Sequence, residues 1–240
     1  MINSVRLAKR VAELRCCSRR EAEQFITGGW VKVDGIVVEE PQFRVADQHI
    51  EIDPQADLGQ RKPVTLLLHK PDGYPMTASD PLVSPLLNTA TLWAEDASGI
   101  RPLKMHFAQL TLCVPLEPSA SGLVVFTQDW RVARKLTEDA AALEHEVIVE
   151  VAGEMAPDGL KRLNQGIPYP GRTPPAIKVS WQNETRLRMA LKGAQPGQIA
   201  HLCQAVGLQV VSMKRIRLGG VSLGKVPPGQ WRYLRGDERF

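Results

Sequence analysis

Glu117 is the residue of this sequence whose type and surroundings point most directly to chemistry. It lies between Pro115 and Pro118, and small residues follow it before the apolar run 123–126. A carboxylate in a short loop that leads into a buried strand can act as a reacting group at the mouth of a cleft. It can equally be a loop carboxylate that takes no part in any reaction. The residues of this loop alone leave both interpretations open.

Other patterns that carry out reactions are missing from the sequence. No glycine lies two residues before Ser119 or Ser121, as a hydrolase nucleophile turn requires. The five histidines show no H-x-x-x-H or H-E-x-x-H spacing, and the four cysteines, of which Cys16 and Cys17 are adjacent, include no C-x-x-C pair. We therefore expect no metal site, and we expect the cysteines to be reduced structural thiols.

The charges of this sequence are unevenly distributed. The formal net charge is +4, but residues 1–33 hold seven Lys or Arg against three acidic residues, and residues 186–240 hold ten against two. The central part is acidic. Two cationic ends suit a polyanionic partner, although solvated basic surfaces are common and charge alone does not decide between them.

The N-terminal part predicts a small unit of two helices and a hairpin. Apolar residues recur at helical spacing over residues 5–14. Ser18 and Glu21 form a capping box that opens a second helix, and Gly28-Gly29 ends it. Asp34-Gly35 then joins two short apolar strands as a hairpin turn.

Basic side chains gather around the junction of these two helices, where they and the positive end of the second helix can converge on phosphate groups. The stretch SRREAEQFITGGWVKVDG, residues 18–35, resembles the αL RNA-binding domain found in a ribosomal small-subunit protein, tyrosyl-tRNA synthetases and several RNA-modifying enzymes. We expect this domain to cover residues 1–53. Its candidate phosphate contacts are Arg6, Lys9, Arg10, Arg15, Arg19, Arg20 and Lys32.

A polar linker, residues 54–62, leads to a second domain of residues 63–240. The first strand of this domain ends at Lys70, because Pro71 forces the preceding residue out of helical geometry and a turn follows. We expect the Lys70 side chain to be displayed at the strand end, where its ammonium group contacts an RNA phosphate or water.

The remaining elements of the second domain alternate without a regular strand-helix-strand repeat. A helix capped by Asp129 and ending near Leu143, another helix from about residue 157, and three strands are expected at 178–181, 186–191 and 209–218. This order favours the α+β class with a mixed, mainly antiparallel sheet. On the last strand, alternation predicts that Arg215 and Arg217 point to one face and Lys214 to the other.

Two stretches of the second domain resemble the bacterial ribosomal small-subunit type of pseudouridine synthase, which also carries an αL domain in front. They are LLLHKPDGYPMTASDP, residues 66–81, and RIRLGGVSLGKVPPGQWRYL, residues 215–234. The resemblance implies that a uridine is flipped out of RNA, that a carboxylate assists cleavage of its glycosidic bond, and that the base rejoins the sugar through carbon. It also implies that neither a cofactor nor a metal takes part.

The same resemblance assigns roles to single positions. Glu117 takes the place of the family's catalytic aspartate and Pro115 that of its arginine, while Ala120 replaces a hydroxyl residue. Val147 takes the place of the tyrosine beside the target base, and residues 197–201 replace a basic helix segment. Glutamate keeps the charge of aspartate but moves the carboxylate by roughly 1 Å, a displacement that matters where reacting atoms must be aligned.

Two functions therefore stay open. In the first, the protein binds structured RNA, with ribosomal RNA as the expected class, and isomerises a uridine through Glu117. In the second, it keeps the fold and the cationic ends without catalysis, and serves as an RNA-binding or ribosome-assembly factor. The family resemblance favours the first, and the changed pocket residues favour the second.

The expected location is the cytoplasm. No stretch approaches eighteen consecutive apolar residues, and the N-terminus has no apolar signal core. We also expect a monomer that has no membrane partner.

Overall fold

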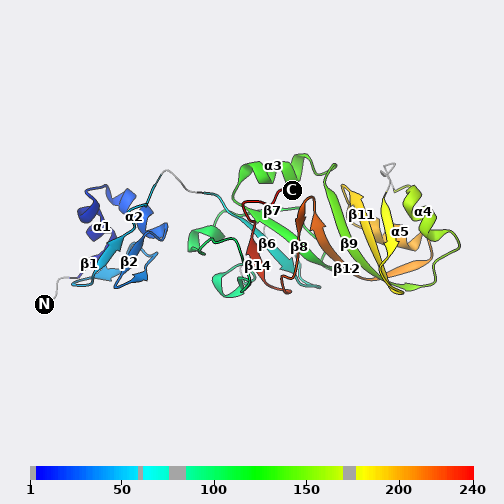
Figure 1. The fold of residues 1–240 in the computed structure, drawn as a ribbon, viewed down its shortest axis with the longest axis horizontal. Helices are drawn as coiled ribbons and strands as arrows, with labels where there is room; N and C mark the ends of the chain where they lie inside the picture. The colour runs from blue at the N-terminus through cyan, green and yellow to red at the C-terminus, as the bar shows by residue number, and fades with distance from the viewer. Residues whose placement is uncertain (1–3, 59–61, 76–84, 170–176) are drawn as a thin grey trace. The chain divides into compact units, whose positions relative to one another are not determined.

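The computed structural model describes residues 4–58, 62–75, 85–169 and 177–240 (Figure 1). The chain forms two compact units. The first contains the residues up to Pro63 together with Arg101–Gln109, and the second contains Val64–Ile100 and Leu110–Phe240. Residues 59–61 of the predicted linker, and the part of the stretch 66–81 that follows Pro75, lie outside the described residues.

The first unit consists of two short helices and two small antiparallel sheets. Its elements are β1 (Val5–Arg6), α1 (Leu7–Arg15), α2 (Arg19–Thr27), β2 (Val31–Val33), β3 (Ile36–Val37), β4 (Arg44–Val45) and β5 (Ile50–Ile52). β1 pairs with β4, and the second sheet has the order β3-β2-β5. The apolar faces of both helices, including Leu7, Val11 and Phe25, are buried in one core with the strands.

The local signals of this unit are confirmed, with one shift at its start. The Ser18 hydroxyl accepts a hydrogen bond from the Glu21 N–H at 3.2 Å, and the Glu21 carboxylate accepts one from the Ser18 N–H at 2.8 Å. Asp34 and Gly35 both have positive φ, 51° and 79°, as the tight turn between β2 and β3 requires. The first helix begins at Leu7 rather than at residue 5, because the two residues before it pair with β4.

The segment Arg101–Gln109 packs in the first unit, although the sequence placed it within the second domain. It contains a 3-10 helix, η3 (Lys104–Phe107). The Lys104 N–H donates to the Glu39 carboxylate at 2.8 Å, and the Lys104 ammonium forms an ion pair with Glu40. These partners are 65 and 64 positions apart in the chain, so no local pattern predicts the contact.

The second unit is built on a nine-stranded sheet. Its strands are β6 (Thr65–Lys70), β7 (Thr111–Cys113), β8 (Ala120–Thr127), β9 (Glu144–Gly153), β10 (Lys178–Trp181), β11 (Arg186–Lys192), β12 (Leu208–Leu218), β13 (Val221–Ser222) and β14 (Trp231–Tyr233). Their order is β10-β11-β9-β12-β8-β6-β14, with β13 beside β12 and β7 beside β8. The β8–β12 pairing is parallel and the others are antiparallel. The predicted α+β class with a mixed, mainly antiparallel sheet is confirmed.

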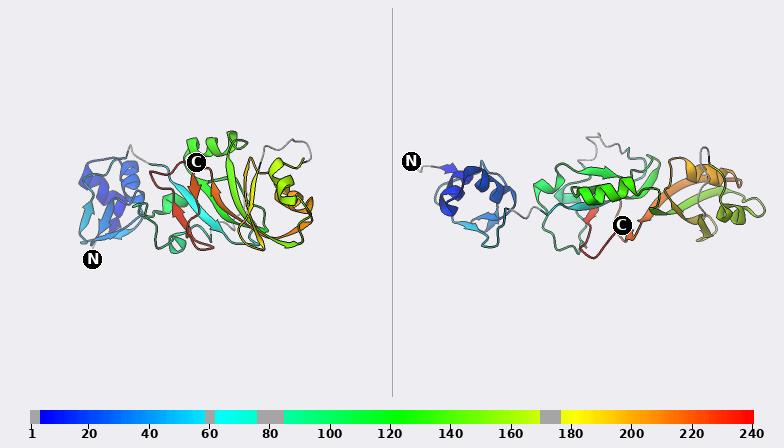
Figure 2. Two further views of the ribbon diagram at one scale, coloured as in Figure 1. Left: turned by 45° about the vertical axis from the view of Figure 1, so that its right-hand side comes forward. Right: turned by 90° about the horizontal axis from the view of Figure 1, so that it is seen from above.

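Helices cover different parts of this sheet. They are α3 (Trp130–Glu138), α4 (Gly159–Gln165) and α5 (Gln198–Gln204), and a 3-10 helix, η2 (Thr89–Thr91), precedes β7. Figures 1 and 2 show α3 near β7 and β8, and α4 and α5 at the end of the sheet that contains β10 and β11. Asp129 caps α3 as predicted, but the helix ends at Glu138 because residues 139–143 form turns.

An irregularity in β12 corrects one prediction. The register of β12 against β9 shifts between Arg215 and Arg217. Arg215 therefore lies opposite Val147, whereas Arg217 forms ion pairs with Glu144 and Glu146 at 2.6 and 2.5 Å. Alternation would have placed both arginines on one face, and the shifted register turns Arg217 to the other.

No helix in the described ranges is long and apolar enough to cross a lipid bilayer.

Candidate active site

Glu117 lies in the wall of a cavity of about 240 Å³ in the second unit. The loop before β8, the strands β9 and β12, and the loop before α5 enclose this cavity. Its walls are mostly apolar, with Leu116, Val147, Ile199 and Met213 among the lining side chains. Its polar lining residues are Glu117, His145, Gln195 and Arg215. A carboxylate, an imidazole and a guanidinium thus converge on an apolar pocket, which is the usual composition of a small-molecule or nucleobase site.

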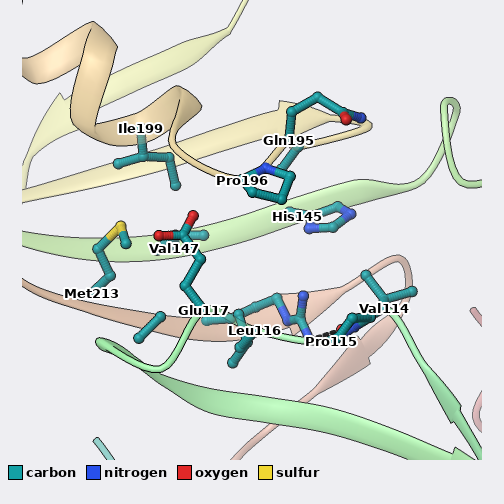
Figure 3. Close-up of a pocket in the computed structure, with 13 residues that line it drawn as sticks. Val114, Pro115, Leu116, Glu117, His145, Val147, Gln195, Pro196, Ile199 and Met213 are labelled. Carbon is teal, nitrogen blue, oxygen red and sulfur yellow. Dashed lines mark hydrogen bonds between the residues drawn. The ribbon is translucent and has the colours of Figure 1, made fainter. Parts of the chain in front are cut away.

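The carboxylate of Glu117 has a defined position. Its Oε1 atom accepts a hydrogen bond from the N–H of Gly197 at 2.7 Å. Gly197, which has a φ of 74°, directly precedes α5. The hydrogen bond therefore joins the loop before β8 to the start of this helix. Figure 3 shows the side chain of Glu117 rising from its loop toward Val147 and Ile199, into the cavity. This hydrogen bond engages one carboxylate oxygen and leaves the second available to a ligand in the cavity.

Lys70 holds the loop that carries Glu117. Its ammonium group donates to the carbonyl oxygens of Pro118 at 2.9 Å, Ala120 at 2.6 Å and Pro71 at 3.0 Å. The side chain is fully buried, and this loss of water lowers the pKa of Lys70. The sequence predicted that Lys70 would be displayed to a phosphate or to water. That prediction is corrected, because all three donor directions of the ammonium point to backbone carbonyls.

Arg215 brings a buried positive charge to the cavity. Its Nε atom donates to the carbonyl of Leu123 at 2.8 Å, and its Nη2 atom donates to the carbonyl of Val114 at 2.6 Å. Burial lowers the pKa of Arg215 to about 9, so the guanidinium is still cationic at neutral pH. Sequence reasoning had considered this residue only as a strand arginine. The signal that would have found it is its alternation with Met213 on the apolar face of β12.

His145 is a neutral polar group of the cavity. Its side chain is buried, and burial together with the charge of Arg215 lowers its pKa to about 4. At neutral pH the imidazole therefore offers one N–H donor and one acceptor nitrogen to a ligand. The adjacent wall position is Val147, whose side chain supplies only apolar contact.

The first unit has a separate groove of about 620 Å³ that is rich in basic residues. Three of the predicted phosphate contacts, Arg6, Lys9 and Arg19, line it, and so does Arg44, which the sequence reasoning missed. Arg44 comes from β4, so it joins the groove through the pairing of β4 with β1. No sequence pattern marks Arg44 as part of the groove, because it reaches the groove only through the pairing of two strands that lie far apart in the sequence.

The other predicted phosphate contacts do not line this groove. Arg10 forms an ion pair with Glu13 at 3.3 Å, and the Arg15 guanidinium lies over the Phe25 ring at 5.2 Å from its centre. Arg20 and Lys32 are exposed elsewhere on the unit. The structure thus gathers three of the seven predicted residues into one groove.

Comparisons with known proteins agree with this architecture. Residues 5–49 match the S4 domain family. A protein from Aquifex aeolicus named as an uncharacterized RNA pseudouridine synthase is 28% identical, and the match covers 98% of this chain and 94% of that protein. Ribosomal small subunit pseudouridine synthase A of Escherichia coli is 26% identical, with 98% of each chain covered. A crystal structure of a pseudouridylate synthase superposes with a TM-score of 0.60 at 20% identity and 96% coverage of both chains, which supports the fold.

Over nearly its whole length this chain is thus similar to RNA pseudouridine synthases, among them one of the ribosomal small-subunit type, and its residues 5–49 match the S4 domain.

The cavity departs from the pattern that the sequence resemblance suggested. Pro115, at the position of the expected arginine, lines the cavity without a guanidinium, and Val147 lines it where a tyrosine was expected. Arg215 brings a guanidinium to the same cavity from a different element. His201, in the segment 197–201 that replaces the family's basic helix segment, does not line the cavity, and its Nε2 atom lies 3.1 Å from the carbonyl oxygen of Pro168.

Gly122 is the residue of the segment around Glu117 whose role the structure explains in steric terms. It has a φ of 109°, and a Cβ atom built on it would lie 2.2 Å from the carbonyl oxygen of Arg215. Only glycine fits here, because both the backbone conformation and the close approach of β12 exclude a side chain. The glycine therefore allows the parallel pairing that brings Arg215 to the loop of Glu117.

Proposed function

We propose that this protein binds structured RNA and isomerises a uridine in it to pseudouridine, with Glu117 as the acting carboxylate. The observation that carries the proposal is the position of Glu117. Its carboxylate faces an apolar cavity, and both its loop and its Oε1 atom are fixed, by Lys70 and by Gly197. A group held in this way before the substrate arrives needs little reorganisation to react.

The reaction breaks the bond between N1 of the uracil and C1′ of the ribose, and it forms a bond between C5 and C1′. The proton leaves C5, and N1 gains one, so the product is an isomer of the substrate. In this proposal the Glu117 carboxylate assists cleavage from the sugar side. Negative charge develops on the detached uracil, and the buried cation of Arg215 stabilises it within the cavity.

The RNA is proposed to be held mainly by the first unit. The basic groove lined by Arg6, Lys9, Arg19 and Arg44 offers charges to the phosphate backbone. One relative is named for the small ribosomal subunit, which supports ribosomal RNA as the substrate class. The proposed division of work follows the predicted domains, with residues 1–53 for RNA binding and residues 63–240 for the reaction. We further propose that the protein acts as a monomer in the cytoplasm.

The test is pseudouridine mapping of total RNA from cells with and without the gene. The deletion strain is complemented with the wild type, with Glu117→Gln, and with Glu154→Gln as a matched control on an exposed carboxylate of the same unit. A pseudouridine that disappears on deletion, returns with the wild type and the control, and stays absent with Glu117→Gln supports the proposal. A site restored fully by Glu117→Gln contradicts the role of the carboxylate.

A second candidate function is RNA binding without isomerisation. The observation in its favour is the lining of the cavity, where Pro115 and Val147 present neither a guanidinium nor a hydroxyl group. An identical pseudouridine map in the presence and absence of the gene, together with recovery of ribosomal RNA on the purified protein, would favour this candidate.

A further inference from the structure

The peptide group between Pro196 and Gly197 is held at both ends. The N–H of Gly197 donates to Glu117 at 2.7 Å, and the carbonyl oxygen of Pro196 accepts a hydrogen bond from the Tyr169 hydroxyl at 2.8 Å. These two atoms belong to one peptide unit, which is planar and rigid. The orientation of the carbonyl therefore fixes the direction in which the N–H points.

We propose that Tyr169 is a positioning residue for Glu117. By holding the carbonyl end of this peptide, the Tyr169 hydroxyl aims the Gly197 N–H at the carboxylate. Tyr169 itself does not line the cavity, so it acts through the peptide and touches no substrate. This role rests on the proposed function, because it matters only if the position of Glu117 matters.

The ring of Tyr169 is fixed from a second side. It packs edge-on against the His201 ring, with ring centres 5.3 Å apart and planes at 74°. The Nε2 atom of His201 lies 3.1 Å from the carbonyl oxygen of Pro168, the residue before Tyr169. His201 belongs to α5, the helix that Gly197 precedes. The residue pair 168–169 is thus attached to the start and to the body of the same helix.

Gly197 makes this close arrangement possible. Its φ of 74° lies in the left-handed region, and a Cβ atom built on it would approach the Tyr169 hydroxyl to 3.4 Å. That distance is an ordinary van der Waals contact, so a side chain at residue 197 would leave room for the hydroxyl but would strain the backbone. Glycine is therefore favoured at residue 197 by the backbone conformation in which its N–H reaches Glu117.

The test uses the full-length protein and Tyr169→Phe, which keeps the ring against His201 and removes only the hydroxyl. The first readout is the Gly197 amide resonance of glycine-labelled protein. Glu117→Gln should shift this resonance from its wild-type position, because a neutral amide accepts the hydrogen bond less strongly than a carboxylate. In the Tyr169→Phe protein the shift caused by Glu117→Gln should shrink, whereas Tyr74→Phe, which removes a hydroxyl outside the cavity lining, should leave it unchanged. A full wild-type shift in Tyr169→Phe overturns the proposal.

The second readout is isomerisation of ribosomal RNA purified from the deletion strain. Tyr169→Phe should lower kcat about fivefold, the equivalent of one missing hydrogen bond, with KM unchanged. A higher KM at unchanged kcat contradicts a positioning role. If the wild type itself does not isomerise this RNA, the proposed function fails, while the amide resonance still decides whether Tyr169 orients Gly197.

Discussion

Gly122 and Arg215 lie opposite each other in the parallel pairing of β8 and β12, in backbone contact. A Cβ atom on Gly122 would lie 2.2 Å from the Arg215 carbonyl oxygen and 2.6 Å from its nitrogen. Both atoms belong to the backbone and cannot move aside as a flexible side chain can. The close approach places the guanidinium of Arg215 beside the loop of Glu117. The packing of β8 against β12 therefore brings a positive charge into the wall of the cavity.

Gly122→Ala should therefore destabilise the second unit severely, by about 4 kcal/mol or more. Two effects add, since alanine is strained at a φ of 109° and its methyl group overlaps the neighbouring backbone. Urea unfolding followed by tryptophan fluorescence measures this change, because four of the five tryptophans belong to the second unit.

Gly224→Ala is the matched control for this substitution. Gly224 also has a positive φ, 63°, but a Cβ atom built on it meets nothing within 4 Å. It should show only the cost of the left-handed backbone, about 1 kcal/mol. Equal destabilisation in the two variants would show that the close approach of β12 contributes nothing.

Lys70→Met should destabilise the protein without a direct effect on RNA binding. The methionine fills similar space but leaves the carbonyls of Pro71, Pro118 and Ala120 without their donor, which should cost about 3 kcal/mol. Lys62→Met, at an exposed position, should leave stability unchanged. A Lys70→Met variant that is as stable as the wild type but binds RNA more weakly would instead support the phosphate contact that the sequence suggested.

Several features that the sequence predicted correctly have local causes. The capping box of Ser18 and Glu21 and the turn at Asp34-Gly35 depend on groups within a few residues, and both are present. They follow from backbone geometry and short-range hydrogen bonds, which the sequence carries directly. The mixed, mainly antiparallel sheet was predicted on different grounds, from the irregular order of strands and helices along the chain.

The site was predictable only in part, because its other members depend on contacts between distant segments. Glu117 could be selected from its loop and its resemblance, and the structure places it in a cavity. Lys70 was expected at the surface, since nothing near it in sequence shows that the loop of residues 118–120 closes over it. Tyr169 acts through Pro196, 27 positions later, so no motif marks it.

His145 should make the second unit sensitive to acid. Burial and Arg215 lower its pKa from 6.5 to about 4 in the folded protein, so between these values the unfolded chain binds more protons than the folded one. The stability contributed by neutral His145 is nearly complete above pH 6.5, and it is lost progressively as the pH falls from 6.5 to about 4. Between pH 7 and pH 5 the stability of the wild type should fall by about 2 kcal/mol more than that of His145→Gln.

Urea unfolding at the two pH values, again by tryptophan fluorescence, measures this difference. Burial lowers the pKa of His69 as well, so some acid sensitivity should remain in His145→Gln. A His145→Gln variant with the full pH dependence of the wild type would show that His145 is protonated equally easily in both states.

RNA binding by the first unit should depend on the groove rather than on basic residues in general. In the double variant Arg6→Gln, Lys9→Gln, two charges are removed from the groove. Each removed cation that neutralises a phosphate should weaken binding and reduce the slope of log affinity against log salt by about one, so the double variant should reduce it by about two. Filter binding to ribosomal RNA over a range of salt concentrations measures both quantities.

The double variant Arg20→Gln, Lys32→Gln removes the same total charge from exposed positions outside the groove. Because long-range attraction depends on net charge, it should slow association slightly, but it should leave the salt slope close to that of the wild type. If the two double variants reduce the slope equally, the phosphates are spread over the surface of the unit, and the groove has no special role in holding RNA.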